Sequence, residues 1–243
     1  MTDTEQKTAL VTGAGRGIGR GICETLAAQG FRVLVADVDL ETATATAAAL
    51  GEGHRALELN VSDSASVDRA FDEAVARFGQ IDVVVNNAGI NRDAMAHKMT
   101  DEQWQIVLDV DLSGVFYVSR AAARHMRERK SGRLVNISSA SWEGNVGQAN
   151  YAAAKAGVLG LTFTLARELA RAGVTVNAIC PGFIDTEMTR GIPADIHQAQ
   201  LDKIPMGRAG APSDVGAAVA FFASEGAGYI TGQVLEVGGG YRI

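Results

Sequence analysis

Short runs of apolar, mostly β-branched residues alternate with longer segments of helical period, and this alternation constrains the fold more than any other feature. Parallel strands joined by crossover helices give such a pattern. Because the runs are almost continuously hydrophobic, we expect strands that are buried on both faces of one sheet. The sequence therefore predicts an α/β fold. The runs are residues 9–11, 33–35, 83–85, 134–137, 174–179 and 234–237.

Helix signals stand between these runs. Apolar residues recur at helical spacing over residues 67–78, with Ser62 or Asp63 available to cap the start and Gly79 to end the helix. Asp39 likewise precedes an alanine- and threonine-rich stretch, which we expect to be a closely packed helix. Both helices would lie against the sheet.

The length and composition favour one packed domain over residues 1–243. Hydrophobic residues make up 47% of the chain and charged residues 21%, which excludes a disordered protein, and α/β folds of this length commonly form a single domain. Residues 182–208 have no clear periodicity. Loops that long inside compact domains are usually lids or binding segments, so we expect a substrate loop there.

A glycine-rich turn directly follows the first apolar run. The residues from Thr12 to Gly19 read Thr-Gly-Ala-Gly-Arg-Gly-Ile-Gly, and a segment with a helical apolar face comes next. Glycines permit a tight turn and a close approach of the backbone to a pyrophosphate, while open amides at a helix start attract negative charge. The turn therefore indicates a dinucleotide site, and a purely structural turn is the alternative.

An acidic residue ends the second apolar run at a position suited to ribose binding. Asp37 follows Gly19 at close to the roughly 20-residue spacing at which a carboxylate meets the adenosine ribose. Its charge would repel a 2′-phosphate, whereas the nearby Arg16 would attract one. We give Asp37 more weight, because the repulsion between its carboxylate and a 2′-phosphate would be larger than the attraction of that phosphate to a solvated arginine. The expected cofactor is therefore NAD in preference to NADP, with a helix-capping role for Asp37 as the alternative.

Tyr151 and Lys155 lie one turn apart near the start of a helical segment, so they share one face. A phenol titrates near pH ~10 in water, and a lysine ammonium close by stabilises the phenolate. The pair is therefore a candidate for proton transfer beside a bound nicotinamide. Taken alone, the spacing is also that of a chance surface contact.

Together with two further segments, these motifs resemble the short-chain dehydrogenase/reductase family over nearly the whole chain. The glycine turn fits that family's Thr-Gly-x-x-x-Gly-x-Gly pattern, and residues 151–155 fit its Tyr-x-x-x-Lys. Residues 86–89 read Asn-Asn-Ala-Gly, and Pro181-Gly182 follows the fifth apolar run. The resemblance implies a single Rossmann-type, doubly wound, seven-stranded parallel sheet with helices on both faces. It also implies an NAD(P)-dependent oxidoreductase that moves a hydride between the nicotinamide and a ketone or secondary alcohol.

The resemblance implies roles for individual residues. Ser138 would hydrogen-bond the substrate oxygen, Tyr151 would donate or accept the proton, and Lys155 would hold the nicotinamide ribose and make the phenol more acidic. Asp111 joins this catalytic group, but it stands where the family usually has an asparagine that helps to hold a water beside the lysine. Its charge would pair with Lys155 and oppose phenolate formation. The expected cofactor contacts are Gly13, Arg16, Gly17, Ile18, Gly19, Asp37, Asn60, Val61, Asn87, Ala88, Gly89, Tyr151, Lys155, Pro181, Gly182, Ile184 and Thr186.

Within the family, the motif strings are most similar to those of 3-oxoacyl-(acyl-carrier-protein) reductases. The similarity lies in residues 91–93, 147–151, 181–186 and 229–232. It implies an acyl-thioester substrate, although that branch commonly prefers NADP, which Asp37 disfavours. Alcohol, diol and sugar dehydrogenases share several of these strings, so a small carbonyl or alcohol is an alternative substrate. A cofactor-binding protein with weakened catalysis is a third interpretation.

Charge and composition bear on partners and location. A net charge of -6 gives no electrostatic reason to bind nucleic acid. The four histidines show no metal-ligand spacing, so we expect no metal, and the two cysteines do not resemble a disulfide framework. No apolar run is long enough to span a membrane, and the first residues lack the order of a signal peptide. We therefore expect no membrane partner and a cytoplasmic location, and the resemblance implies a homotetramer.

Overall fold

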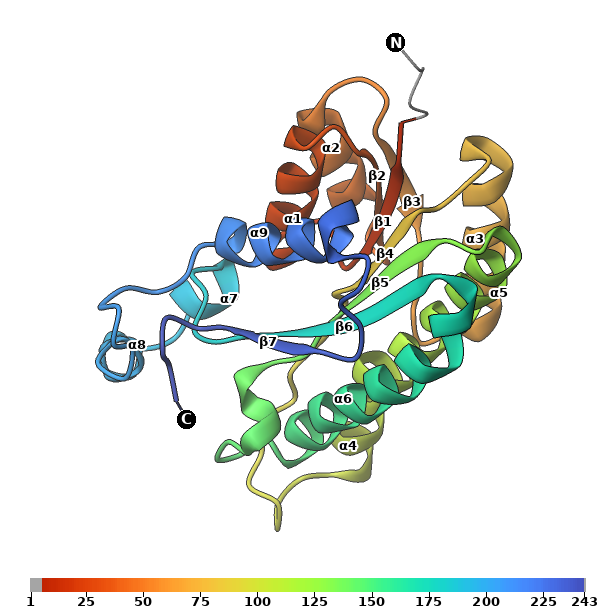
Figure 1. Cartoon of the computed structure of the whole chain (residues 1–243). Helices are drawn as coiled ribbons and strands as arrows, with labels where there is room; N and C mark the ends of the chain where they lie inside the picture. Colours follow the sequence, from red (N-terminus) through yellow and green to blue (C-terminus); the bar gives the residue numbers. More distant parts are fainter. Residues whose placement is uncertain (1–5, 243) are drawn as a thin grey trace.

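One parallel sheet organises the chain, whose computed structural model describes residues 6–242 (Figure 1). Within these residues, seven strands pair in the order β3-β2-β1-β4-β5-β6-β7, and every pairing is parallel. This confirms the predicted sheet; the expectation about a signal peptide falls largely on residues 1–5, outside the described part. The strands are β1 Thr8–Thr12, β2 Arg32–Asp37, β3 Arg55–Glu58, β4 Val83–Asn86, β5 Gly132–Ile137, β6 Val174–Pro181 and β7 Val234–Val237.

Helices cover both faces of the sheet, as predicted (Figure 1). Successive side chains of a strand point to opposite faces, so Leu10 packs into one hydrophobic core while Ala9 and Val11 pack into the other. The first core includes side chains of α3, α5 and α6, and the second includes side chains of α1, α2 and α9. The helices are α1 Gly17–Ala28, α2 Leu40–Leu50, α3 Ser64–Phe78, α4 Asp101–Leu108, α5 Gly114–Arg129, α6 Ala149–Leu169, α7 Glu187–Arg190, α8 Ala194–Leu201 and α9 Pro212–Ala223.

The strand order reverses between β1 and β4. The chain builds β1, β2 and β3 toward one edge of the sheet and then returns to add β4 to β7 toward the other. In open α/β sheets, ligands bind at such a reversal, beyond the carboxyl ends of the strands. The glycine turn after β1 and the Asn-Asn-Ala-Gly segment at the end of β4 therefore meet where a ligand site is expected.

Capping residues mark the ends of the helices that the sequence predicts. The carboxylate of Asp63, rather than Ser62, caps α3 by accepting the Ala65 N–H, and Gly79 ends the helix with a φ of 73°. Asp39 caps α2 by accepting two backbone N–H groups of the first turn. A positive φ at a helix end favours glycine, because a Cβ there is crowded. These predictions are confirmed.

Two regions differ from the sequence-based expectation. The apolar runs do not include β3, which lies at the sheet edge and buries only Leu57 among its four residues. The segment 182–208, expected as a loop, contains the short helices α7 and α8. Since none of the residues of α8 is buried, that helix has no apolar stripe to reveal it in the sequence.

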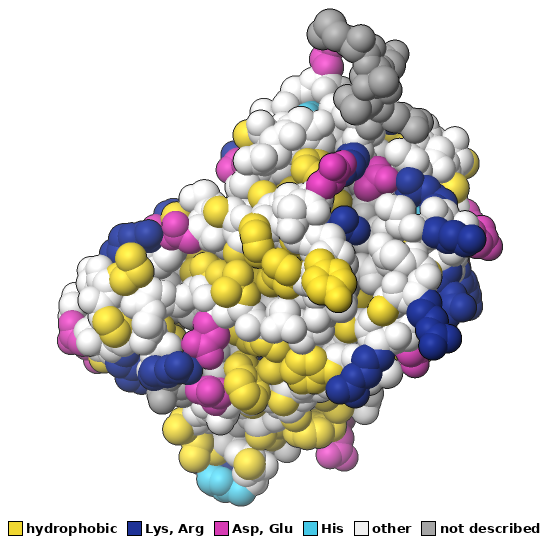
Figure 2. Space-filling view, viewed as in Figure 1, with side chains coloured by type: hydrophobic (Ala, Val, Ile, Leu, Met, Phe, Trp, Pro, Cys, Tyr) yellow, Lys and Arg dark blue, Asp and Glu magenta, His cyan; other side chains and the backbone are white. Residues whose placement is uncertain are grey.

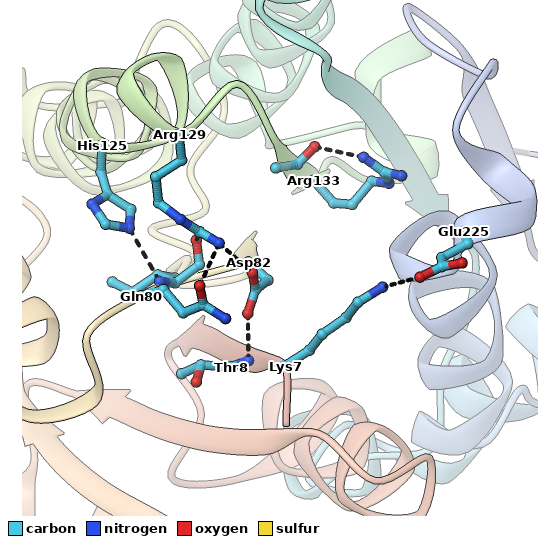
Figure 3. A network of polar contacts seen from close by, with 10 residues as sticks. Lys7, Thr8, Gln80, Asp82, His125, Arg129, Arg133 and Glu225 are labelled. Carbon is cyan, nitrogen blue, oxygen red and sulfur yellow. Dashed lines mark hydrogen bonds and ion pairs between the residues drawn. The ribbon is translucent and has the colours of Figure 1, made fainter. Parts of the chain in front are cut away.

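At the amino ends of the strands, a network of polar contacts joins α5, β1 and the segment just before β4 (Figure 3). The guanidinium of Arg129, at the end of α5, donates to Gln80 Oε1 at 2.6 Å and to Asp82 Oδ1 at 2.9 Å. Asp82, just before β4, also accepts the Thr8 N–H of β1 at 2.8 Å. His125 Nε2 accepts the backbone N–H of Ile81 at 3.2 Å. This network lies at the opposite end of the strands from the expected ligand site.

Cys23 and Cys180 are both buried free thiols. Within residues 6–242, no helix is both long and apolar enough to cross a lipid bilayer. The same residues contain no cluster of three or more histidine, cysteine or acidic side chains that could hold a metal ion.

Candidate active site

The glycine turn between β1 and α1 is shaped by the close approach of a second loop. Gly13 and Gly17 have φ values of 60° and 55°, which residues other than glycine rarely adopt. A Cβ at Gly13 would lie 2.7 Å from the Cα of Ala88, and a Cβ at Gly19 would collide with the carbonyl oxygen of Gly13 and the amide of Asn87. Only glycine therefore lets the two loops meet.

The start of α1 offers open amides to an anion. Arg16 is its N-cap residue and makes no capping hydrogen bond through its exposed side chain. The first backbone N–H groups of a helix have no partner within the helix, and the helix dipole adds positive charge there. Ile18 and Gly19 lie in this first turn. The cradle is therefore suited to a pyrophosphate.

Asn87 and Ala88 brace the glycine turn from the end of β4. The amide of Asn87 donates to the carbonyl oxygens of Thr12 and Gly13, each at 2.9 Å. The hydroxyl oxygen of Thr12 accepts the backbone N–H groups of both Asn87 and Ala88 at 3.1 Å. The resemblance implies that these two residues contact a cofactor; the structure shows that they hold the turn in shape.

Asp37 lies at the carboxyl end of β2, beside the glycine turn. Its Oδ2 accepts the Gly15 N–H at 2.9 Å, and its Oδ1 accepts the Asp39 N–H at 3.1 Å. These two bonds hold a carboxylate at the edge where an adenosine ribose would lie. Asn60 and Val61 follow β3 on the same side; Asn60 is exposed, and Val61 is buried against Gly114 at the start of α5.

Ser138, Tyr151 and Lys155 come together where the carboxyl end of β5 meets the first two turns of α6. The Nζ atom of Lys155 lies 5.3 Å from the ring centroid of Tyr151 and donates to the carbonyl oxygen of Ile137 at 3.2 Å. The Ser138 hydroxyl donates to the carbonyl oxygen of Lys155 at 2.9 Å. Ser138 and Lys155 are buried, whereas Tyr151 is partly exposed. Tyr151 is therefore the member of the group with surface open to solvent.

Asp111 reaches the same group from a π-helical segment, Asp109–Ser113, between α4 and α5. Such segments are rare in proteins, and those that occur are often at functional sites. Its Oδ2 lies 3.2 Å from Lys155 Nζ, and its Oδ1 accepts the Ile90 N–H at 2.9 Å. Gly89 makes room for the pair, because a Cβ there would lie 2.8 Å from Asp111 Oδ2 and 3.2 Å from Lys155 Nζ.

The pKa values of this buried pair follow from its surroundings. Burial raises the pKa of Asp111 and outweighs the opposing charge of Lys155 and the hydrogen bond from Ile90. Burial lowers the pKa of Lys155, but the negative charge of Asp111, followed by that of Tyr151, raises it above its usual value. Lys155 therefore remains an ammonium ion through the neutral pH range.

The segment after β6 closes over the glycine turn. β6 ends at Pro181, and the Gly182 N–H donates to the carbonyl oxygen of Val237 at 3.0 Å. Ile184 is buried and forms an isolated parallel bridge with Gly210. Thr186 caps α7, and its methyl carbon lies 3.8 Å from where a Cβ of Gly17 would be.

Two hollows lie beside this segment. One, of about 150 Å³, is lined by Trp142, Glu143, Cys180, Gly182, Glu236 and residues 238–242, among others. The other, of about 580 Å³, is more open and is lined by residues of the segments 185–201 and 207–211. Each borders the segment 182–208, where the sequence predicts a substrate loop.

The sequence did not indicate a buried polar chain beneath the site. Asn86 donates to Asn136 Oδ1 at 2.8 Å and to Ser119 Oγ at 3.0 Å, and Asn136 donates to Thr162 Oγ1 at 2.8 Å. Asparagines within otherwise apolar strand runs are the signal that could have found it. Buried amides of this kind are stable only when they are hydrogen-bonded, so they tie β4, β5, α5 and α6 together under the catalytic group.

Known proteins match this chain over almost its full length. A family model described as enoyl-(acyl carrier protein) reductase matches residues 13–242. The chain is 47% identical over 237 residues to the 3-oxoacyl-[acyl-carrier-protein] reductase FabG of Escherichia coli (strain K12), covering 97% of each chain. It is 44% identical over 237 residues to FabG of Vibrio cholerae, again with 97% of each chain covered. With FabG of Staphylococcus aureus (strain Mu50) the identity is 44% over 239 residues, covering 96% of this chain and 97% of the relative.

Proposed function

The chain belongs to the short-chain dehydrogenase/reductase family, and we propose that it reduces 3-oxoacyl thioesters with NADH in preference to NADPH. Members of this family are NAD(P)-dependent oxidoreductases, so the enzyme class is settled by membership. The substrate is proposed from the relatives, which are named for the reduction of a 3-oxoacyl group on acyl carrier protein. The alternative substrates are a free alcohol, a diol or a sugar.

The observation that carries the proposal is the grouping of Ser138, Tyr151 and Lys155 at one end of the sheet. Tyr151 is partly exposed, and the Lys155 ammonium lies 5.3 Å from its ring centroid. A cation at that distance favours the phenolate that remains after the proton is given up. The hydroxyl of Ser138 now donates to a backbone carbonyl oxygen, and rotation about its side-chain bond would direct it to a substrate oxygen instead.

In the proposed reaction, the ketone at C3 of the acyl chain becomes a secondary alcohol. A bound nicotinamide would supply the hydride for the new C–H bond. Ser138 and the Tyr151 hydroxyl orient the ketone oxygen through hydrogen bonds, and Tyr151 gives its proton to that oxygen as the negative charge develops. Lys155 stabilises the phenolate until a solvent proton replaces the one transferred.

The residues around the glycine turn fit a dinucleotide. A Cβ at Gly13 or Gly19 would fill the space between the two loops, and α1 begins with open amides suited to a pyrophosphate. Asp37 would accept hydrogen bonds from the ribose hydroxyls. Gly17, Ile18, Asn60, Val61, Asn87 to Gly89, Pro181, Gly182, Ile184 and Thr186 would form the remaining wall of the cofactor site.

The preference for NADH rests on Asp37. Its carboxylate is held by the Gly15 and Asp39 N–H groups, so it cannot easily turn away from a 2′-phosphate. Two anions that face each other without a cation between them are unfavourable. Arg16 is the one side chain of the turn that could supply such a cation, and it is exposed to solvent, where its charge is screened.

We further propose that residues 1–243 form one domain, with 182–208 as the substrate loop, and that the protein is a homotetramer. Apolar side chains are exposed on two faces. Figure 2 shows one, where hydrophobic side chains gather over α9 and beside β7. Phe221 of α9 and Leu235 of β7 are exposed apolar side chains of these two elements. Exposed patches of this kind mark association sites. A cytoplasmic location is proposed with this function, and the two buried free thiols are compatible with it.

A panel of substrates tests the proposed function. Acyl thioesters with a 3-oxo group, simple ketones, secondary alcohols, diols and sugars are each assayed with NADH and NADPH, and the change in nicotinamide absorbance is followed. The proposal expects the highest kcat/KM for a 3-oxoacyl thioester with NADH. A clear preference for a free alcohol or sugar, or cofactor binding without any turnover, would replace it with one of the alternatives.

A further inference from the structure

The residue before the proposed catalytic tyrosine, Asn150, is fully buried and uses both ends of its side-chain amide. Its Nδ2 donates to the carbonyl oxygens of Arg92 at 3.0 Å and Gln103 at 2.8 Å. Its Oδ1 accepts the backbone N–H of Tyr151 at 2.8 Å. An amide has two N–H donors, and here each has a backbone acceptor. No other uncharged side chain of this length could make the same three bonds in the same place.

These bonds join three segments that meet at the catalytic group. Arg92 belongs to the loop that follows β4, Gln103 lies in α4, and Tyr151 lies in the first turn of α6. Two more bonds lie just before Asn150 in the sequence. Gln148 Nε2 donates to Asp93 Oδ2 at 3.0 Å, and the Ala94 N–H donates to the carbonyl oxygen of Gly147 at 2.9 Å. The start of α6 is therefore fastened along the loop 92–94.

Tyr151 depends on this fastening because of its place in α6. The first four N–H groups of a helix have no partner within the helix, and helix starts fray for that reason. Gln148, the N-cap residue of α6, makes no side-chain capping bond. Asn150 satisfies the Tyr151 N–H instead and anchors the same turn to α4 and to the loop after β4.

We propose that Asn150 is a positioning residue, which holds the first turn of α6 so that the Tyr151 hydroxyl stays within reach of both the substrate oxygen and the Lys155 ammonium. This inference rests on the proposed role of Tyr151 as proton donor. Displacements of about 1 Å cost about 100-fold in rate when they affect reacting groups. Asn150 itself touches no reacting atom in this account.

The chain offers a matched control in Asn177. It is also fully buried, and its amide also bonds to backbone at both ends, donating to Ile230 O at 2.9 Å and accepting the Gln233 N–H at 3.0 Å. It links β6 to the segment before β7 and makes no bond to α6. Loss of either amide leaves buried backbone groups without partners, which destabilises the fold, but only loss of Asn150 releases the turn that carries Tyr151.

The test compares Asn150→Ala, Asn150→Asp and Asn177→Ala in the full chain. The carboxylate of Asn150→Asp keeps an acceptor for the Tyr151 N–H but would face the two carbonyl oxygens without a donor. We expect both Asn150 variants to lose about tenfold or more in kcat per cofactor-binding site, with a smaller change in the dissociation constant for NADH. Asn177→Ala should keep kcat within about twofold of the wild-type value, even if its Tm falls as far as that of the Asn150 variants.

A readout that does not need turnover is hydrogen–deuterium exchange of the peptide spanning residues 147–156. It should exchange faster in both Asn150 variants and remain unchanged in Asn177→Ala. Wild-type kcat and exchange in Asn150→Ala would overturn the proposal, and wild-type kcat in Asn150→Asp would reduce the residue to a helix cap. If wild-type protein failed to reduce any substrate, the proposed function would fall, whereas the exchange comparison would still decide the positioning.

Discussion

The ion pair between Asp111 and Lys155 is the most unusual feature at the scale of single residues. The carboxylate is fully buried and lies 3.2 Å from the ammonium. Burial removes water from both charged groups, so a buried ion pair is stable only where its geometry is good and further hydrogen bonds satisfy the remaining polar atoms. Here Ile90 supplies one of these bonds and Gly89 leaves the space. The sequence predicted the pairing of the charges, but not the π-helical turn that delivers Asp111.

The charge of Asp111 should move the pH dependence of catalysis. It holds Lys155 as an ammonium and opposes a second negative charge on the nearby phenol. In Asp111→Asn the carboxylate that raises the pKa of Lys155 is gone, so that pKa should fall. For alcohol oxidation, we therefore expect the rising limb of log kcat against pH to move to lower pH by about one unit in the variant. Superimposable profiles of the two proteins would remove the electrostatic role assigned to Asp111.

Asp37 should control the choice between the two nicotinamide cofactors. In Asp37→Ser, the anion that faces a 2′-phosphate is gone, so the ratio of kcat/KM for NADPH to that for NADH should rise by about tenfold or more. Arg16→Ala serves as the control, because it should weaken the use of NADPH and leave the use of NADH largely unchanged. An unchanged cofactor ratio in Asp37→Ser would contradict this role.

At the scale of helices and strands, the sequence predicts elements that carry a continuous apolar run or clear capping residues and misses those that do not. The expected burial on both faces is wrong for β7, which lies at the sheet edge and has no buried residue among its four. The six apolar runs all lie in strands, and Asp39, Asp63 and Gly79 cap helices as expected. β3 was missed because an edge strand with one buried residue has no continuous apolar run. α8 was missed because its exposed surface leaves no periodic signal.

The candidate site could be predicted to a similar extent. Tyr151, Lys155 and the glycine turn have fixed spacings, so a linear motif indicates them. The bracing by Thr12 and the anchoring by Asn150 depend on partners far away in the chain, such as Asn87 and Arg92. No spacing within one segment encodes such contacts, and only the folded chain shows them.

The polar network at the amino ends of the strands makes the fold sensitive to acid. His125 accepts the Ile81 N–H, so its ring must be unprotonated there. Burial, and then the charge of Arg129, lower its pKa, while Glu128 and Asp82 partly oppose this. The unfolded chain therefore binds a proton more readily than the folded one. The stabilisation is complete above the ordinary histidine pKa of about 6.5 and is lost as the pH falls through the lowered value.

Urea unfolding between pH 7.5 and 5 measures this effect. His125→Gln can still present an acceptor to Ile81 but does not titrate, so its free energy of unfolding should fall less steeply with decreasing pH than that of the wild type. His54, which accepts the Val33 N–H and has a pKa lowered by burial and by Arg55, contributes in the same direction in both proteins. Equal slopes for the two proteins would rule out a contribution from His125.

At the scale of the whole molecule, apolar side chains are exposed on two groups of elements within residues 6–242, and we take each group as a face for the proposed assembly. Trp104, Ile106, Phe116 and Phe163 are exposed on the helices α4, α5 and α6, and Phe221 and Leu235 on α9 and β7. Two separate self-complementary faces, each joining copies through a twofold axis, give a closed tetramer with dihedral symmetry. This arrangement would bury both faces and leave the carboxyl ends of the central strands free for cofactor and substrate.

A charge placed in one face should separate the proposed tetramer into dimers. Phe221 is 49% exposed, so Phe221→Asp should fold normally while opposing burial of that face. Light scattering coupled to size-exclusion chromatography should give the mass of a tetramer for the wild type and of a dimer for the variant. Ile196→Asp, an exposed apolar position on α8 outside both faces, should remain a tetramer. A monomeric wild type would contradict the proposed assembly.

The central claim is that the Tyr151 hydroxyl gives its proton to a ketone oxygen while the Lys155 ammonium stabilises the phenolate left behind. The most direct measurement is the rate of NADH oxidation by Tyr151→Phe with a 3-oxoacyl thioester, together with the affinity of the variant for NADH. We predict a loss of about 100-fold or more in kcat, because the proton donor is gone, with NADH binding nearly unchanged. A variant that keeps the wild-type rate would contradict this account of the site.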